Sequence, residues 1–188
     1  WATIIFMKNK FVDTYRPTTF KNIILSKSLR KDIQNIIKNK SFNNLIFYGT
    51  AGNGKTTTAR VICEELNCDL YEVNASIKGI DALRKEITNF ATTVSLEGKS
   101  KVVLLDEADN MSKAFQQALR GTIESVSRNC TFILTANYYD RILPAIQSRC
   151  TSYDFSISED DNEIAQQTIK ACEGILRKEK IKMIYNYS

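Results

Sequence analysis

The sequence of 188 residues has no histidine, only two prolines and five cysteines. Without histidine, the chain has no histidine-based acid–base catalyst and no Ser-His or Cys-His nucleophile. No two cysteines form a C-x-x-C pair, so the sequence indicates neither a zinc ribbon nor a redox dithiol. Because their number is odd and the opening residues lack the flanks of a signal peptide, we expect reduced thiols and a cytoplasmic protein. The cysteines are Cys63, Cys68, Cys130, Cys150 and Cys172.

Long apolar runs and a strong charge excess are also missing. No stretch approaches the roughly 18 apolar residues of a membrane-spanning helix, so we expect no membrane partner. The net charge of +5 permits contact with a polyanion but does not establish one. With 43% hydrophobic and 25% charged residues, the composition is that of an ordinary globular domain.

The sequence does contain a complete phosphate-binding loop. Residues 49–56 match G-x-x-x-x-G-K-[ST], after an apolar run at 44–48 and before a helical pattern at 56–66. The glycines allow backbone N–H groups to turn towards a phosphate. Lys55 is placed to reach the β- and γ-phosphates of a nucleotide, and the Thr56 hydroxyl to ligate Mg²⁺. The predicted loop contacts are Gly49, Thr50, Ala51, Gly52, Asn53, Gly54, Lys55, Thr56 and Thr57.

Two acidic residues follow a second apolar run, at 102–105. Asp106 would hold Mg²⁺, and Glu107 would polarise the attacking water, which are the roles that hydrolysis of a γ-phosphate needs. Asn137 ends a further strand-like run and could orient that water or touch the γ-phosphate. The same residue could instead cap the next turn.

Apolar runs alternate with helical patterns, which predicts a three-layer α/β fold with a parallel five-stranded sheet. From residue 158 a capping-box pattern and a helical apolar stripe begin a new unit. The expected strands cover 44–48, 70–73, 101–105, 131–135 and 151–155, and the expected helices cover 29–39, 55–66, 79–93, 112–126 and 140–148.

The order of these motifs, followed by Ser148-Arg149-Cys150, resembles an AAA+ ATPase of the sliding-clamp-loader branch. More narrowly, residues 12–155 resemble the ATPase subunit of T4-type phage clamp loaders and the small subunits of replication factor C. The segment 12–17, Val-Asp-Thr-Tyr-Arg-Pro, is similar to a V-E-K-Y-R-P element that packs on the adenine in those proteins. The adenine contacts that this resemblance implies are Val12, Tyr15, Arg16, Pro17 and Ile24.

The resemblance also implies a domain organisation. Residues 7–156 would form the AAA+ P-loop ATPase domain, and residues 157–188 the first part of a truncated helical lid. Residues 1–6 precede a methionine that looks like a natural start, so we expect them to be upstream or non-native residues.

Partners follow from the same resemblance. Arg149 would act in trans, as an arginine finger at the nucleotide of a neighbouring subunit in a hetero-oligomeric ring, expected to be a pentamer. Lys78 and Arg84 match basic positions that follow the phosphates of primer–template DNA, and Lys113 is a weaker candidate. The implied function is ATP hydrolysis coupled to loading a ring-shaped sliding clamp onto that DNA.

Two alternatives remain open at this point. One is another DNA-linked AAA+ machine, of the branch-migration or replication-initiator type. The second is a non-hydrolysing structural subunit of a clamp-loader ring. The Y-R-P element argues against the first, and the intact set Lys55, Thr56, Asp106 and Glu107 argues against the second.

Overall fold

The structure is a computed structural model that describes residues 14–75, 80–93, 95, 98–157 and 162–186, the last nine of these and residues 80–81 without their side chains. The predicted adenine contact Val12, the predicted DNA contact Lys78 and the segment 1–6 lie outside the described residues.

Five parallel strands form one sheet, in the order β2-β3-β4-β1-β5. The central strands β1, β3 and β4 are almost entirely buried because helices cover both faces, which explains their unbroken apolar sequences. The predicted parallel five-stranded sheet is therefore confirmed. The strands are β1 (Leu45–Tyr48), β2 (Asp69–Asn74), β3 (Lys101–Asp106), β4 (Cys130–Ala136) and β5 (Thr151–Asp154).

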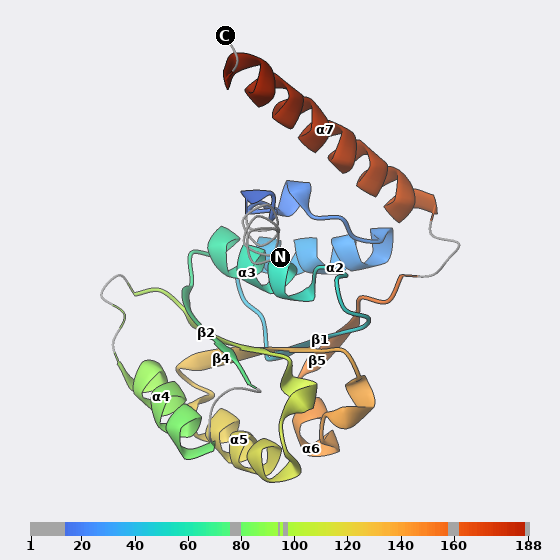
Figure 1. The fold of residues 1–188 in the computed structure, drawn as a ribbon. Helices are drawn as coiled ribbons and strands as arrows, with labels where there is room; N and C mark the ends of the chain where they lie inside the picture. The colour runs from blue at the N-terminus through green and yellow to red at the C-terminus, as the bar shows by residue number, and fades with distance from the viewer. Residues whose placement is uncertain (1–13, 76–79, 94, 96–97, 158–161, 187–188) are drawn as a thin grey trace, which may run out of the picture.

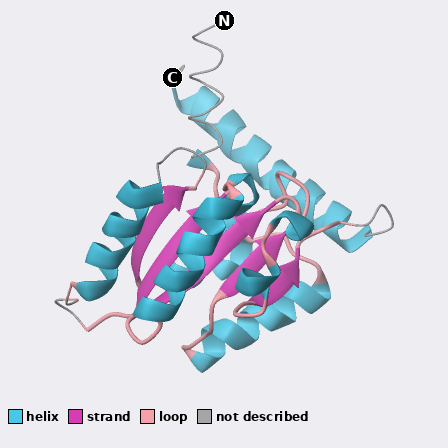
Figure 2. Cartoon of the chain, turned by 90° about the horizontal axis from the view of Figure 1, so that it is seen from below, coloured by secondary structure: helices cyan, strands magenta, loops and turns pink. Residues whose placement is uncertain are grey.

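Helices lie on both faces of the sheet and complete the three layers (Figure 1). On one face lie α2 (Lys27–Asn39) and α3 (Lys55–Glu65), with the short η1 (Phe20–Asn22) beside them. The other face carries α4 (Ile80–Thr92), α5 (Lys113–Val126) and α6 (Pro144–Gln147), with η2 (Ala108–Asn110) and η3 (Tyr139–Arg141) in the connections. Figure 2 shows the strands side by side between these helices.

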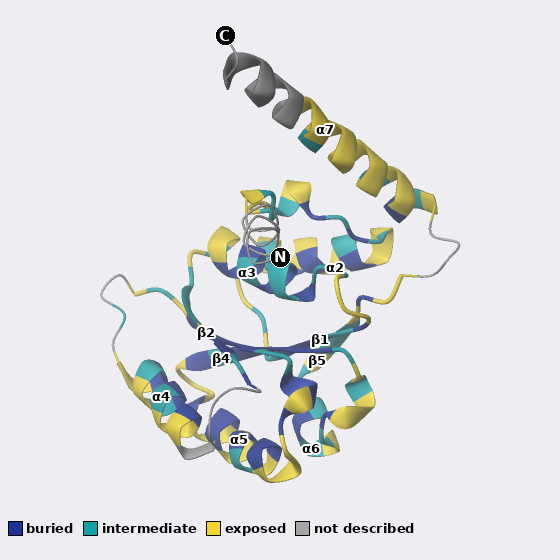
Figure 3. Ribbon diagram, in the orientation of Figure 1, coloured by how far each residue is buried: buried dark blue, intermediate teal, exposed yellow. Residues whose placement is uncertain are grey.

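Two apolar clusters, one on each face of the sheet, form the core (Figure 3). On the α2–α3 face, Phe47 packs against Phe155 with ring centroids 4.9 Å apart. The α4–α5 face is filled by side chains such as Phe132 and Leu105. Serine caps start two of the helices, since Ser26 accepts from the Leu29 amide and Ser112 from the Phe115 amide, and α2 therefore begins two residues before its predicted start.

The last helix, α7 (Asn162–Asn186), begins against α2 and then extends away from the sheet (Figure 1). Glu163 pairs with Lys27 at 3.3 Å, and Ile164 is buried at this contact. Farther along, Ile169 and Leu176 are 59% and 68% exposed. Most of the predicted apolar stripe therefore has no cover from the described residues, and the division into an ATPase domain and a lid remains a prediction.

All five cysteines are free thiols: Cys63 and Cys130 are buried, Cys68 and Cys150 are half-buried, and Cys172 is exposed. Burial raises the pKa of the Cys63 thiol to about 12 and those of Cys130 and Cys150 to about 11, so these thiols stay protonated at neutral pH. Within the described part of the chain, no three His, Cys, Asp or Glu side chains are grouped as metal ligands, and no helix is long and apolar enough to cross a membrane.

We predict that Gly49→Ala is costly while Gly121→Ala is not. Gly49 has φ +134°, and a Cβ there would meet the Ser156 nitrogen at 2.8 Å and the Phe155 carbonyl carbon at 2.9 Å. The free energy of unfolding in urea should fall by about 2–3 kcal/mol. Gly121 lies in α5 with open space around it, so alanine should raise stability by about 0.5–1 kcal/mol. Equal unfolding midpoints for the two variants would contradict this explanation.

Candidate nucleotide and magnesium site

The phosphate-binding loop leads from the buried strand β1 into α3. Gly52 and Gly54 have φ values of +86° and +82°, which other residues rarely adopt, and a Cβ at either position would meet nothing within 4 Å. The space that side chains would occupy is thus open beside the first N–H groups of α3, where the helix dipole favours an anion. This cradle fits a phosphate group.

Lys55 lies at the centre of the site and is 8% exposed. Its Nζ donates to the carbonyl oxygens of Gly49 (2.7 Å) and Thr50 (2.9 Å) and to Oδ1 of Asn137 (3.1 Å). Burial lowers the pKa of Lys55, while the charges of Asp109 and Asp106 oppose that shift. The structure therefore brings the predicted lysine and Asn137 together, although the two are 82 residues apart in the sequence.

A cluster of oxygen atoms lies next to this lysine. Oδ1 of Asp106 accepts hydrogen bonds from the Thr56 hydroxyl, at 2.7 Å, and from the Thr135 hydroxyl. Carboxylate and hydroxyl oxygens are ligands that Mg²⁺ accepts, and this ion commonly keeps several of its waters. The predicted pair Thr56 and Asp106 thus has the donor atoms and the proximity that a Mg²⁺ site requires.

Glu107 adopts a left-handed backbone conformation with φ 57° and ψ 43°. A non-glycine residue in this region costs about 1–2 kcal/mol, so the surrounding structure must hold it there. Two contacts do so: the Glu107 amide donates to the Thr135 hydroxyl at 3.1 Å, and Oε2 accepts from Nδ2 of Asn74 at 3.0 Å. The carboxylate is thereby fixed at the carboxyl edge of the sheet, beside Asp106.

A cavity of about 530 Å³ opens over the loop. It joins Tyr15, Arg16 and Pro17 to the loop, so these predicted adenine contacts and predicted phosphate contacts line one space. Two predicted contacts, Ile24 and Asn53, line a smaller neighbouring hollow instead, and Ala51 is exposed on the loop. The cavity is lined by Tyr15, Arg16, Pro17, Gly52, Gly54, Lys55, Thr56, Thr57, Arg60 and Asp106.

Asn53 faces away from the main cavity for a definable reason. Its Nδ2 donates to the Thr50 hydroxyl at 2.6 Å and to the Phe155 carbonyl oxygen at 2.9 Å. The side chain therefore ties the phosphate-binding loop to the chain that leaves β5.

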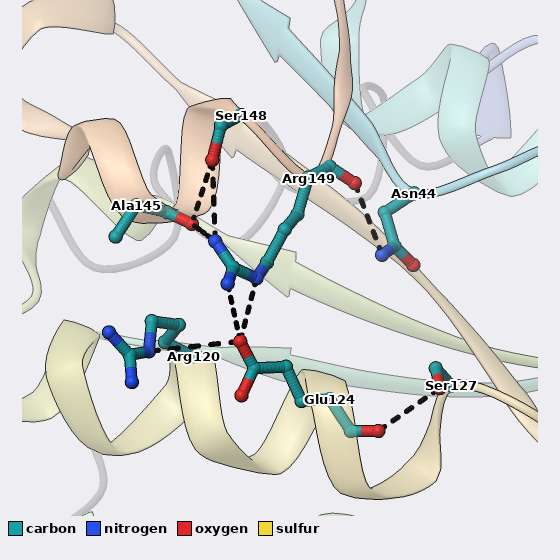
Figure 4. Close-up of polar contacts among 7 residues, drawn as sticks. All are labelled: Asn44, Arg120, Glu124, Ser127, Ala145, Ser148 and Arg149. Carbon is teal, nitrogen blue, oxygen red and sulfur yellow. Dashed lines mark hydrogen bonds and ion pairs between the residues drawn. The ribbon is translucent and has the colours of Figure 1, made fainter.

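Arg149 lies at the other end of the sheet. Its carbonyl oxygen accepts from Nδ2 of Asn44, which directly precedes β1, whereas the phosphate-binding loop directly follows β1. The guanidinium is bonded to Glu124 on α5 (Figure 4). Arg149 is thus not part of the nucleotide cavity of its own chain.

The two described DNA candidates lie on the face opposite α3. Arg84 is exposed on α4, and Lys113 is exposed in the first turn of α5. These two helices run side by side below the sheet in Figure 1. Neither residue lines the nucleotide cavity.

Sequence reasoning missed three residues of this site. Thr135 appeared to be one more residue of a buried strand, but β4 lies next to β3 and turns its hydroxyl towards Asp106. Asn74 ends β2 in register with Asp106, so the rule that parallel strands share a carboxyl edge could have found it. Arg60 lines the cavity while both its Nε and Nη2 bond to Glu72, and no sequence motif indicated it.

Residues 45–156 match the family described as ATPase family associated with various cellular activities (AAA). The chain belongs to the AAA family of ATPases. It is 41% identical over 152 residues to the replication factor C small subunit of Thermofilum pendens, covering 77% of this chain and 47% of that protein. It is also 38% identical over 191 residues to replication factor C small subunit 1 of Pyrobaculum aerophilum, covering 94% of this chain and 56% of that one. The AAA chain thus spans about half the length of these relatives.

Solved structures support the fold of this AAA chain. The Thermotoga maritima RuvB Holliday junction branch migration motor superimposes with a TM-score of 0.68 over 87% of this chain and 55% of that one. The sequence identity is 17%, so this similarity bears on the fold alone. The three-layer AAA+ fold predicted from the sequence is confirmed, and ATP binding and hydrolysis are the general activity of the family.

We predict that Thr135→Val separates the role of the Thr135 hydroxyl from its volume. The variant keeps the shape but leaves an Asp106 oxygen and the Glu107 amide without this partner, so unfolding free energy should fall by about 1–3 kcal/mol. The Mg²⁺ concentration for half-maximal ATP turnover should rise. Thr131→Val, at the amino end of the same strand, should change stability by less than about 0.5 kcal/mol. An unchanged Mg²⁺ dependence of Thr135→Val would contradict the assignment.

Proposed function

We propose that this chain is the ATPase module of a sliding-clamp loader, which hydrolyses ATP to open and place a ring-shaped clamp on primer–template DNA. The proposal rests on the hydrogen bonds that bring Lys55 to Asn137 and Thr56 to Asp106 at the carboxyl edge of the sheet. Arg149 lies at the opposite edge. The replication factor C small subunits of similar sequence support the clamp-loading part.

The chain's own residues would handle the nucleotide as follows. Tyr15, Arg16 and Pro17 would hold the base, while the N–H groups of residues 52–56 and Lys55 would bind the phosphates. Mg²⁺ bound by Thr56 and Asp106 would neutralise charge that develops on the phosphates during hydrolysis.

Glu107 would act as the general base. Once the hydrogen bond from Asn74 to the Glu107 carboxylate is broken, Glu107 would accept a proton from the attacking water. Asn137 would help to orient that water. Among the described residues that line this cavity, the cations besides Lys55 are Arg16, which lies with the proposed base contacts, and Arg60, which is bonded to Glu72. An arginine from a second chain could therefore neutralise charge that develops on the γ-phosphate. Arg149 of this chain is partly exposed, so it could serve that role at the nucleotide site of a neighbouring chain.

For DNA, we propose that Arg84, Lys113 and Lys78 contact phosphates without reading the sequence. Arg84 and Lys113 project from the helices that cover the same face of the sheet, and the free N–H groups at the start of α5 add a favourable dipole. Raising the salt concentration should weaken such contacts steeply, because they depend on counterion release.

The two alternatives are weaker. A branch-migration motor shares the fold, but the structural similarity to RuvB comes with only 17% sequence identity, against 41% for a replication factor C small subunit. A non-hydrolysing subunit would not need a strained Glu107 held beside Asp106.

We predict that Glu107→Gln abolishes turnover and leaves ATP binding intact. Glutamine keeps the size and the hydrogen bonding but cannot take a proton, so phosphate release in the complete loader with clamp and DNA should fall at least about 100-fold. Filter binding of labelled ATP should be unchanged. Lys55→Ala should instead weaken binding itself, because it removes the cation at the phosphates. Normal turnover by Glu107→Gln would leave the enzymatic proposal without its base.

A further inference from the structure

A cluster of polar contacts surrounds Arg149 (Figure 4), which is not among the residues that line the nucleotide cavity of its own chain. Nε and Nη2 of Arg149 donate to the same oxygen, Oε1 of Glu124, at 2.9 Å and 2.5 Å. Nη1 donates to the Ala145 carbonyl oxygen at 2.5 Å and to the Ser148 hydroxyl at 3.3 Å. The guanidinium is therefore hydrogen-bonded on two sides, by the carboxylate on α5 and by residues at the end of α6.

These hydrogen bonds select one conformation of a flexible side chain. A free arginine has about 2 kcal/mol of rotamer entropy, and most of its rotamers would turn the guanidinium away from any one target. The backbone carbonyl of Ala145 lies in α6, which ends two residues before Arg149, and it fixes one edge of the guanidinium. Glu124 fixes the other edge from a different helix, so it determines the direction in which the side chain extends.

The ion pair between Arg149 and Glu124 contributes little to the free energy of unfolding. The side chains of Arg149 and Glu124 are 36% and 45% exposed, and exposed pairs contribute about 0–1 kcal/mol. Arg120 also lies 3.9 Å from the same Glu124 oxygen, so the carboxylate keeps a cation beside it if Arg149 shifts. The pair is thus strong enough to bias rotamers and weak enough to let the guanidinium take an additional partner.

We propose that Glu124 is a positioning residue, which holds the Arg149 guanidinium in the pose that enters the nucleotide site of a neighbouring subunit. This inference rests on the proposed role of Arg149 in trans. The partially exposed guanidinium meets the phosphate while Glu124 retains its inner edge. The ion pair therefore contributes to turnover at the neighbour's site and not to ATP binding at its own.

The test is a double-mutant cycle on ATP turnover by the assembled complex with clamp and DNA. Glu124→Ala should lower kcat about tenfold without changing the KM for ATP, because a misplaced catalytic group loses orientation and not substrate binding. Glu124→Gln, whose amide oxygen can still accept from Nε, should lose less. In an Arg149→Lys background, which lacks the planar fork that Glu124 grips, Glu124→Ala should cost less than about twofold.

Glu163→Ala is the matched control. It truncates a glutamate of similar exposure, 40% against 45%, which pairs with Lys27 on the opposite face of the sheet, and it should leave kcat unchanged. Circular dichroism melting of each variant checks that all of them fold.

Each other outcome overturns the proposal in its own way. A faster Glu124→Ala complex would mean that Glu124 sequesters Arg149 and does not position it. An equal loss in both backgrounds would mean that Glu124 acts independently of Arg149, and an unchanged rate would mean that it has no role. If Arg149→Lys alone turns over ATP normally, the role in trans fails, and this inference fails with it.

Discussion

The site depends on one hydrogen-bonded oxygen, Oδ1 of Asp106, which accepts from Thr56 and from Thr135. Through Thr56 it ties the carboxyl end of β3 to the start of α3, and through Thr135 it ties β3 to β4. The Glu107 amide bonds to the same Thr135 hydroxyl, so the backbone of the proposed base is fixed by that junction. The phosphate-binding loop, the proposed metal ligands and the proposed base are thus positioned relative to one another by a few short contacts at one sheet edge.

The strands of the sheet and the phosphate-binding loop could be predicted from the sequence because both depend on local sequence patterns. Buried parallel strands require unbroken apolar runs, and the phosphate-binding loop requires glycines at fixed spacing. Contacts between neighbouring strands were less accessible. The role of Thr135 follows only from β4 lying next to β3, and the turn of Asn53 towards Phe155 follows only from the approach of β5 to the loop.

Arg149 and Glu124 illustrate the same limit. The Ser-Arg-Cys motif drew attention to Arg149, but nothing in the sequence paired it with a glutamate 25 residues earlier. That pairing depends on α6 folding back across α5. Two exposed charges that contribute little to stability can still determine where a guanidinium points, so a small free energy can have a large effect on geometry.

Asn53 has a mechanical consequence. Its amide joins the phosphate-binding loop to the Phe155 carbonyl, and the backbone at Gly49 approaches the same segment too closely to admit a side chain. Any rearrangement that a bound triphosphate imposes on the loop must therefore displace the exit of β5 as well. Ile164, near the start of α7, lines one small hollow together with Asn53 and Phe155, so the first turn of that helix borders the point where the loop is attached.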